Sequence, residues 1–286
     1  MTYDVAQLRG SFPSLATGIA HFDSPAGTQT PRPVGEAIAR TITGPLSYRG
    51  RLGRSEANAE AAVMRFRKAY AALLNAEPSG IVYGRSATQL TYDFSHHLSV
   101  AWGPGDEIVV TRLEHDANVR PWVQAAKRTG ASIRWVDFDP ATGELDTAGA
   151  IASLGDRTRL VALTAASNLI GTIPPVAQIA SAAHRAGALV WVDAVHYAAH
   201  ELVDFGALRA DFLVCSPYKF LGPHCAVLAA DPLVLEGIRP DKLVPSTDVV
   251  PERFEYGTLP YEMLAGATAA VDFLAGIDPG AGSTRR

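Results

Sequence analysis

Between residues 80 and 230, short runs of apolar residues alternate with longer amphipathic stretches. Several of the runs are nearly unbroken, as expected for strands that are covered by helices on both faces. The alternation of such runs with helical patterns is typical of βα units, so we expect a mostly parallel sheet of seven strands. The predicted strands are GIVYG (80–84), EIVVTR (107–112), SIRWVDF (132–138), RLVALTA (159–165), LVWVDAV (189–195), DFLVCS (211–216) and AVLAA (226–230).

The stretches between these runs predict amphipathic helices. In VAQIASAAHRAG (176–187), Ile179, Ala183 and Ala186 fall on one face, and a glycine ends the stretch. The longest predicted helix is SEANAEAAVMRFRKAYAALLN (55–75), and its expected N-cap is Ser55. The first 35 residues are rich in Pro, Gly and Thr, so they predict an extended arm.

The pattern changes after about residue 232. A proline-rich connection leads to one helix, YEMLAGATAAVDFL (261–274), and a single helix cannot build a core of its own. Either this segment docks on the large domain, or it begins a second domain that the sequence cuts short, and we favour the second alternative. The expected organisation is an N-terminal arm (1–35), a large domain (36–232), and a connection with the first helix of a truncated small domain (233–286).

Composition and charge exclude several classes of function. The chain has 286 residues, of which 48% are hydrophobic, and its net charge is −4 with a pI of about 6.1. No basic cluster indicates a nucleic acid or an anionic membrane surface, and no apolar run reaches the roughly 18 residues of a membrane span. The first residues lack the pattern of a secretory signal, and two cysteines are too few for a disulfide framework. We therefore expect a cytoplasmic protein, and the sequence predicts no metal site.

Polar side chains follow most of the predicted strands. In an open parallel sheet, ligands bind at the carboxyl ends of the strands, so these side chains are candidates for a functional site. They comprise a lysine, a strand-end carboxylate, imidazoles and a Ser/Thr turn that opens a helix. The candidates are Ser86, Thr88, Glu114, His115, Ser167, Asn168, Asp193, His196, Ser216 and Lys219.

Each candidate also has an interpretation without function. Ser86 in GRSATQL can simply cap a helix, or its turn can bind a phosphate, because a helix N-terminus offers free N–H groups and a favourable dipole. Asp193 can cap the next helix, although a carboxylate that ends an apolar strand is better explained by a cationic partner. His115 taken alone is better interpreted as an interior histidine, and His96 and His97 are interpreted as structural.

Pyridoxal phosphate (PLP) explains these residues together. Lys219 would form a Schiff base with the cofactor, and Asp193 would keep the pyridine nitrogen protonated so that the ring can act as an electron sink. The turn at Ser86 would anchor the phosphate. Once a substrate amine displaces Lys219, the lysine would move a proton at the substrate's α-carbon.

Six motifs carry a resemblance to a known family. They occur in family order over nearly the whole chain, as HFDSPAGTQTP (21–31), LEHDANVRPW (113–122), SNLIGT (167–172), WVDAVH (191–196), SPYKFLGP (216–223) and FEYGTLP (254–260). The chain resembles the class V aminotransferases of PLP fold type I, specifically their cysteine desulfurase-like branch. The resemblance implies the large domain of that fold, a three-layer α/β/α sandwich, and we expect the family's C-terminal small domain to be missing.

The resemblance also assigns roles to matched positions. Lys219 would be the Schiff-base lysine, Asp193 the partner of the pyridine nitrogen, and His115 the residue that stacks on the ring. Asn168 and His196 would approach the ring hydroxyl. The implied phosphate ligands are Ser86, the backbone of Ala87 and Ser216, with Thr88 as an alternative donor, and Thr258 reaching the phosphate of a neighbouring subunit. The last of these roles implies a homodimer with shared active sites.

Several positions depart from the family pattern. Tyr218 and Tyr48 stand where relatives place histidines that serve the phosphate and the substrate, and His196 stands where many relatives have glutamine. The family's carboxylate-clamping arginine and the loop with its persulfide-forming cysteine belong to the missing domain. Cys215 and Cys225 lie in or beside apolar strands, so we interpret both as small buried hydrophobic residues. The resemblance therefore supports PLP binding more strongly than desulfurase chemistry.

Two functions are left open by the sequence. The first is a PLP-dependent transferase or lyase that acts on a small amino acid, cysteine desulfurase-like or class V aminotransferase-like, through a Schiff base on Lys219. The second is a PLP-binding chain that is catalytically incomplete, either a fragment or a degenerate non-enzymatic relative. A scaffold without cofactor is disfavoured, because it leaves Asp193 and Lys219 unexplained. The sequence specifies neither the amino-acid substrate nor any sulfur-accepting partner protein.

Overall fold

The computed structural model describes residues 4–277, and within that part the chain forms a seven-stranded sheet. Its strands lie in the order β1-β7-β6-β5-β4-β2-β3, and all neighbouring pairs are parallel except the two that β7 makes with β1 and β6. The mostly parallel sheet is thus confirmed, with all seven predicted strands. Their bounds are β1 Ile81–Gly84, β2 Glu107–Thr111, β3 Ser132–Val136, β4 Thr158–Thr164, β5 Leu189–Asp193, β6 Phe212–Cys215 and β7 Ala226–Ala230.

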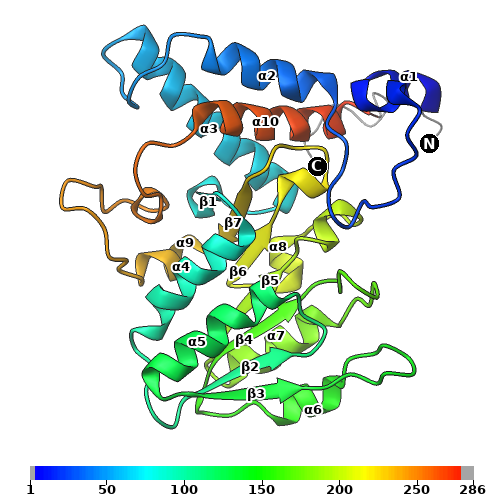
Figure 1. Ribbon diagram of the computed structural model, residues 1–286. Coiled ribbons are helices and arrows are strands. Elements are labelled where there is room, and N and C mark those ends of the chain that lie inside the picture. The colour runs from blue at the N-terminus through cyan, green and yellow to red at the C-terminus, as the bar shows by residue number, and fades with distance from the viewer. Residues whose placement is uncertain (1–3, 278–286) are drawn as a thin grey trace.

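Helices cover both faces of this sheet (Figure 1). The helices of the described residues are α1 Val5–Gly10, α2 Arg32–Ile42, α3 Arg54–Leu74, α4 Ala87–Ser99, α5 Arg120–Thr129, α6 Thr147–Ala152, α7 Val176–Arg185, α8 Phe205–Leu208, α9 Pro232–Glu236 and α10 Tyr261–Ala275. One apolar core contains side chains of α3, α7 and α10, and a second contains side chains of α4 and α5. Successive side chains of a strand point to opposite faces, so Val190 and Val192 of β5 join the first core and Trp191 joins the second. This arrangement is the three-layer α/β/α sandwich that the resemblance implied.

The longest helix, α3, begins one residue earlier than predicted, and Ser55 is not its N-cap. Gly53 occupies that position, and the Glu56 carboxylate accepts hydrogen bonds from the N–H groups of Leu52 (2.8 Å) and Gly53 (3.4 Å). Because Glu56 reaches back to the start of the helix, no serine hydroxyl is required there. The helix is followed by Asn75, whose φ of 52° is the left-handed conformation that asparagine tolerates.

The N-terminal region is not the fully extended arm that its composition predicts. Helix α1 is capped by the Asp4 side chain, and α2 begins at Arg32, inside the expected arm of residues 1–35. The prediction was wrong there because proline is tolerated in the first turn of a helix, where its missing N–H would have no partner. Pro33 occupies that part of α2. Residues 18–31 contain neither helix nor strand.

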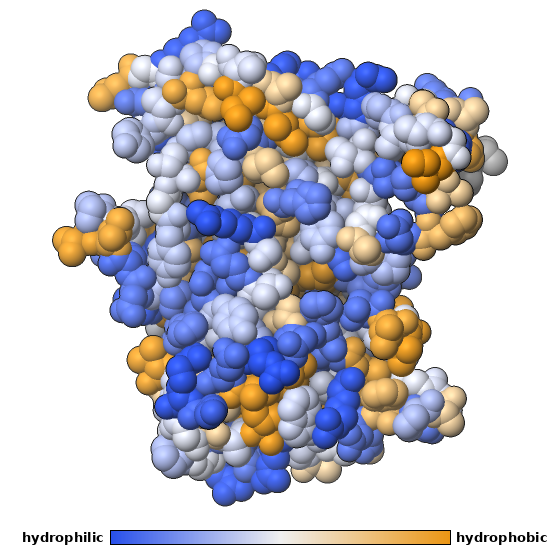
Figure 2. All heavy atoms as spheres, viewed as in Figure 1, coloured by the Kyte–Doolittle hydropathy of each residue, from blue (hydrophilic) through white to orange (hydrophobic). Residues whose placement is uncertain are grey.

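The connection between α9 and α10 projects from the body of the molecule (Figure 1). Apolar atoms gather at its tip on the face shown in Figure 2. Leu243 and Val244 of this connection are 70% and 97% exposed. Large apolar side chains that gather at an exposed tip are unusual on the surface of a monomer.

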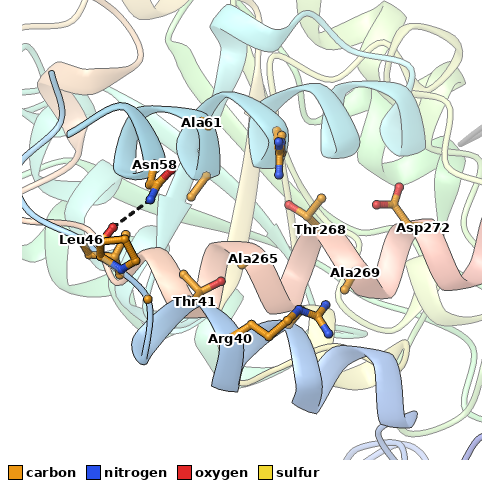
Figure 3. Close-up of a pocket in the computed structure, with 14 residues that line it drawn as sticks. Arg40, Thr41, Leu46, Asn58, Ala61, Ala265, Thr268, Ala269 and Asp272 are labelled. Carbon is orange, nitrogen blue, oxygen red and sulfur yellow. Dashed lines mark hydrogen bonds between the residues drawn. The ribbon is translucent and has the colours of Figure 1, made fainter. Parts of the chain in front are cut away.

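Helix α10 lies along α2 and α3 (Figure 1). Its residues Leu264, Ala267 and Val271 are buried, and the Tyr70 hydroxyl of α3 donates a hydrogen bond to the Ala267 carbonyl (3.3 Å). The helix therefore packs on the large domain, where its apolar side chains are buried, and the division into two domains stays a prediction. A hollow of about 620 Å³ lies between the three helices (Figure 3). The end of the expected small domain, residues 278–286, lies outside the described residues.

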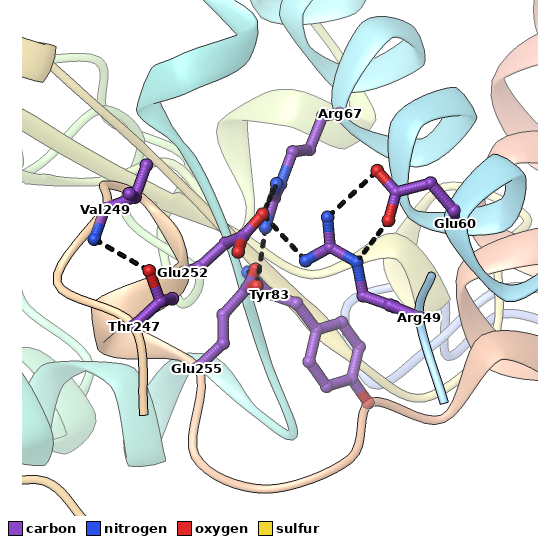
Figure 4. A network of polar contacts seen from close by, with 8 residues as sticks. All are labelled: Arg49, Glu60, Arg67, Tyr83, Thr247, Val249, Glu252 and Glu255. Carbon is purple, nitrogen blue, oxygen red and sulfur yellow. Dashed lines mark hydrogen bonds and ion pairs between the residues drawn. The ribbon is translucent and has the colours of Figure 1, made fainter. Parts of the chain in front are cut away.

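A network of ion pairs attaches the connection before α10 to α3 (Figure 4). Arg67 of α3 pairs with Glu252 (3.0 Å) and Glu255 (2.6 Å), and Arg49 also pairs with Glu252 (2.7 Å). Glu255 accepts a further hydrogen bond from the Tyr83 N–H in β1 (3.0 Å). The network therefore holds the start of the FEYGTLP motif against the sheet.

Candidate active site

Nearly all of the predicted site residues line one cavity at the carboxyl ends of the parallel strands. They come from the N-terminus of α4 and from the segments that follow β2, β4, β5 and β6. Tyr218, Thr164, Ala166, Ala117 and Val195 complete the lining, and none of these five was a predicted site residue. The predicted residues in the lining are Ser86, Ala87, Thr88, His115, Asn168, Asp193, His196, Ser216 and Lys219.

Lys219 ends a single 3₁₀ turn that follows β6. Its Nζ donates a hydrogen bond to the Pro25 carbonyl (2.6 Å) and lies 5.8 Å from the centre of the Tyr218 ring. Burial lowers the pKa of Lys219, and the Asp193 carboxylate opposes that shift. A lysine with a lowered pKa presents more of the neutral amine, which is the form that attacks a carbonyl group.

Asp193 ends β5 and is 7% exposed. Its Oδ1 accepts a hydrogen bond from the Val195 N–H (2.8 Å). Burial raises the pKa of Asp193, while the Val195 N–H, His115 and Lys219 act in the opposite direction. A buried carboxylate is stabilised by a cation close to it, and a protonated pyridine nitrogen would be such a cation. The surroundings of Asp193 therefore fit the cofactor that the sequence predicts.

Glu114, a candidate from the sequence that received no specific role, is a partly buried acid beside the cavity. Its Oε1 accepts hydrogen bonds from the Thr111 hydroxyl (2.5 Å) and the Thr164 N–H (2.8 Å), and its Oε2 accepts one from the Asn118 amide (2.7 Å). Burial raises the pKa of Glu114 to about 8, although these three hydrogen bonds lower it, and Asp193 raises it further. The side chain joins the ends of β2 and β4 to the turn after β2, so it holds two parts of the cavity wall together.

The N-terminus of α4 supports both interpretations of the Ser86 turn. The Ser86 hydroxyl accepts a hydrogen bond from the Gln89 N–H (3.1 Å), so the capping role is confirmed. Ala87 and Thr88 are the first two residues of the helix, where N–H groups have no acceptor within the helix, and both line the cavity. Ser216 is buried and contributes a hydroxyl to the same cavity. An anion bound there would accept hydrogen bonds from these groups and benefit from the helix dipole.

Two predicted histidines line the cavity in different surroundings. The Nδ1 of His115 accepts a hydrogen bond from the Ala117 N–H (3.1 Å), which orients its imidazole. The His196 ring makes an edge-to-face contact with His200, with 4.6 Å between the ring centres. Burial lowers the pKa of His196, and His200 and Lys219 lower it further, so the neutral imidazole is favoured.

Several residues discussed from the sequence lie outside the cavity lining, among them the candidates Glu114 and Ser167. Thr258 is exposed in the connection before α10, and Tyr48 is 76% exposed. Cys215 and Cys225 are buried, as predicted, and burial raises the pKa of the Cys225 thiol to about 12. A thiol that stays protonated is a poor nucleophile, so neither cysteine is suited to persulfide chemistry.

The hollow between α2, α3 and α10 has different chemistry (Figure 3). Its lining consists mainly of small side chains, together with Arg40, Arg65 and Asp272, and contains none of the predicted site residues. Within residues 4–277, no group of three or more His, Cys, Asp or Glu side chains is arranged to hold a metal ion. The predicted chemistry is therefore concentrated around Lys219.

Comparison with known proteins identifies the family. A model of the Aminotransferase class-V family matches residues 20–281. Among curated proteins, the chain is 34% identical to the uncharacterized protein MT3887 of Mycobacterium tuberculosis (strain CDC 1551 / Oshkosh), covering 100% of this chain and 72% of that protein. The chain belongs to the class V aminotransferase family, as its six motifs predicted.

Solved structures agree with this assignment. The cysteine desulfurase CsdA from Escherichia coli matches with a TM-score of 0.87 and 28% identity, covering 97% of this chain and 73% of CsdA. A variant of the cystine C–S lyase C-DES, with glycine covalently linked to its PLP cofactor, matches with a TM-score of 0.80 and 25% identity, covering 92% of this chain and 72% of that protein. These structures confirm the cysteine desulfurase-like branch, and the C-DES relative is a PLP-dependent enzyme.

Proposed function

We propose that this chain is a PLP-dependent enzyme that acts on a small amino acid through a Schiff base on Lys219, with cysteine desulfurase-like or class V aminotransferase-like chemistry. The observation that carries the proposal is the cavity in which Lys219, Asp193 and the N-terminus of α4 meet. A nucleophilic amine, a buried carboxylate and an anion site are the groups that the cofactor needs at its aldehyde, ring nitrogen and phosphate. The family and its PLP-linked relative support the same cofactor.

Each residue would have a role that follows from its surroundings. Asp193 would hold the pyridine nitrogen protonated, because its buried carboxylate is stabilised by a cation. His115 would lie against the ring face, and Asn168 and His196 would contact the ring hydroxyl. The phosphate would be bound at the anion site, by Ser86, the N–H groups of Ala87 and Thr88, and Ser216. Bound in this way, pyridoxal phosphate supplies the electron sink for the reaction.

Lys219 would have a second role as the group that moves a proton at the substrate's α-carbon. Burial lowers the pKa of its amine, so the released side chain has a larger neutral fraction than an exposed lysine. The neutral amine would accept the proton from the substrate's α-carbon and return it to the product. The turn that carries Lys219 keeps the amine at the cavity throughout.

A PLP-binding protein that is catalytically incomplete is the second candidate. Cys215 and Cys225 are both buried, so neither supplies the exposed thiolate to which a desulfurase transfers sulfur. The buried carboxylate of Asp193 favours an active enzyme instead, because a protein that only binds the cofactor has no need of an electron sink.

We also propose a homodimer whose active sites contain residues of both subunits. Thr258, which would bind the phosphate held by a neighbouring subunit, is exposed and does not line the cavity of its own chain. Leu243 and Val244 are exposed in the connection between α9 and α10. Apolar side chains gathered in this way indicate a surface that a second copy of the chain covers.

The location and the domain boundaries stay predictions. No helix between residues 4 and 277 is long and apolar enough to cross a bilayer. A cytoplasmic location rests on the sequence alone. The division into an arm (1–35), a PLP-binding large domain (36–232) and a C-terminal segment (233–286) is likewise a proposal.

Trapping with borohydride tests the cofactor assignment. Pyridoxal phosphate is added to the purified chain, the absorbance of a lysine imine is recorded, and the reduced adduct is located by peptide mapping. We expect the label on Lys219, and Lys219→Arg should lose both the absorbance and the label. Lys127→Arg, which changes an exposed lysine of α5, should keep both. A label on another lysine, or none, would contradict the proposal.

A product assay separates the candidate reactions. The PLP-loaded chain receives cysteine and a thiol reductant in one sample, and small amino acids with an acceptor keto acid in another. Alanine with sulfide indicates a desulfurase, and formation of a new keto acid indicates an aminotransferase. A labelled Lys219 with neither product indicates the incomplete protein.

A further inference from the structure

Residues 24–28, called the strap below, are hydrogen-bonded to the turn that carries Lys219. Thr28 makes three of these contacts with residues about 190 positions further along the chain. Its N–H and its hydroxyl donate to the Tyr218 carbonyl (2.9 and 3.1 Å), and its hydroxyl oxygen accepts from the Leu221 N–H (2.7 Å). The strap therefore holds the turn on both sides of the lysine.

The turn depends on an external contact because its backbone is strained. Leu221 has a φ of 74°, in the left-handed region that a leucine rarely adopts. The Pro217 carbonyl accepts hydrogen bonds from the N–H groups of Phe220 (2.9 Å) and Gly222 (2.8 Å). The N–H of Leu221, which lies between them, donates to the Thr28 hydroxyl instead. A conformation of this kind persists only where surrounding contacts stabilise it, and Thr28 supplies one.

The strap also explains Tyr218, which stands where relatives place a histidine. A Cβ atom added at Gly27 would lie 3.3 Å from Cδ2 of the Tyr218 ring, so the strap backbone passes close to that ring. The same ring stacks on His224, with 5.0 Å between the ring centres. Tyr218 thus packs the strap against the turn at the point where the Lys219 Nζ donates to the Pro25 carbonyl.

We propose that Thr28 is a positioning residue whose hydroxyl holds the turn so that Lys219 points to the same place in the cavity before and after each reaction. The inference rests on the proposed role of Lys219 in the Schiff base. Thr28 does not itself line the cavity, so its effect passes through the turn. The Pro25 carbonyl, which lies 2.6 Å from the Nζ, would receive the lysine while the substrate occupies the cofactor.

The hydroxyl is the group that this position requires. One oxygen atom donates to the Tyr218 carbonyl and accepts from the Leu221 N–H, so it bridges the two sides of the turn. Thr28→Val keeps the shape of the side chain and removes both bonds, whereas Thr28→Ser keeps both. Thr43→Val is the matched control, because that exposed hydroxyl donates only to the nearby Ala39 carbonyl (2.7 Å).

Amide hydrogen exchange in the cofactor-free protein tests whether Thr28 stabilises the turn that carries Lys219, and the test does not depend on the proposed function. We expect the Leu221 N–H to be protected in the unmodified chain and to exchange about tenfold faster in Thr28→Val, which lacks its acceptor. Thr28→Ser and Thr43→Val should keep the protection. An unprotected Leu221 N–H in the unmodified chain would overturn the proposal even if Thr28→Val does not fold. Equal exchange in Thr28→Val and the unmodified chain would overturn it as well.

A second measurement separates the positioning of Lys219 from a general change in the cavity. Pyridoxal phosphate reports imine formation, and pyridoxine phosphate, which has an alcohol in place of the aldehyde, reports non-covalent binding. We expect Thr28→Val to slow imine formation about tenfold, with an unchanged Kd for pyridoxine phosphate, and Thr28→Ser to restore the rate. If Thr28→Val slowed imine formation and weakened the binding of pyridoxine phosphate by the same factor, the proposal would be contradicted. If the unmodified chain forms no imine on Lys219, the proposed function fails, and hydrogen exchange alone decides whether Thr28 holds the turn.

Discussion

Burial shifts the pKa values of individual side chains in the cavity. Burial raises the pKa of Asp193 and lowers that of Lys219, so both side chains are shifted toward their neutral forms. A protonated ring nitrogen would stabilise the Asp193 carboxylate, and an imine would remove the charge of the Lys219 amine. Bound in this way, the cofactor would relieve the electrostatic cost of both residues at once, which a purely structural interpretation of the pair does not explain.

The raised pKa of Glu114 predicts how the stability of the folded chain depends on pH. Its pKa is about 8 in the folded chain against 4.5 for an ordinary glutamate, so the folded state holds an extra proton between these values, and stability falls as the pH rises through them. Glu114→Gln removes this titration, so the free energy of unfolding should fall less between pH values of about 5 and 8. Denaturant unfolding at both pH values measures the change.

The exposed residue Glu36 provides the control for this measurement. Glu36→Gln should keep the pH dependence of the unmodified chain, because its side chain is not buried. If Glu114→Gln loses as much stability with rising pH as the unmodified chain does, the buried acid is not the cause.

Some residues of the site could be predicted from the sequence, and the roles of others could not. Lys219, Asp193 and His115 could be predicted because each follows a strand and their combination suits one cofactor. Glu114 lies beside His115 in the same motif, but its role as a buried acceptor depends on donors from three separate segments. Thr28 lies in the first of the six motifs, but its role could not be predicted because its partners lie about 190 residues away.

Among the elements, α3 and the connection before α10 depend on one buried ion pair (Figure 4). The side chains of Arg67 and Glu255 are 5% and 4% exposed, and burial raises the pKa of Glu255 while Arg67 lowers it. Arg67→Met would leave the Glu255 carboxylate buried without its cation. We expect the free energy of unfolding to fall by about 3–5 kcal/mol, measured by denaturant unfolding.

A second arginine on a helix makes the matched control. Arg40 of α2 pairs with Glu36 at 3.7 Å, and both side chains are exposed. Arg40→Met should therefore change the free energy of unfolding by less than about 1 kcal/mol. Equal losses in the two variants would mean that burial does not distinguish the two ion pairs.

Elements with a continuous apolar pattern could be predicted well. Each strand was predicted to within two residues at both ends, and for all except the mostly exposed edge strand β3 the reason is that strands buried on both faces are unbroken apolar runs. Helix α1 was missed, and it contains no buried residue, so no apolar periodicity marks it. The start of α3 was misplaced because its cap depends on the return of the Glu56 side chain to the backbone.

For the whole molecule, we predict a dimer with a mass of twice 30.3 kDa in light scattering. Val244→Lys places a charge on the exposed apolar tip, and we expect the dimer to dissociate at least about tenfold more readily, since burying an unpaired ammonium is unfavourable. Leu233→Lys, at an 82% exposed position of α9, is the control and should dimerise normally. A monomeric unmodified chain, or an unchanged Val244→Lys dimer, would refute this interface.

By itself, the sequence determined the positions of the seven strands along the chain, the family, and most residue types of the cavity. These properties belong to short stretches, where apolar periodicity and motif residues can be read directly. Only the tertiary structure decided that the strap is hydrogen-bonded to the turn that carries Lys219, and that Glu114 accepts hydrogen bonds from three separate segments. It also decided that α10 packs on α2 and α3. Such contacts join segments far apart in the chain, and burial and hydrogen bonding depend on distances in space that local sequence does not contain.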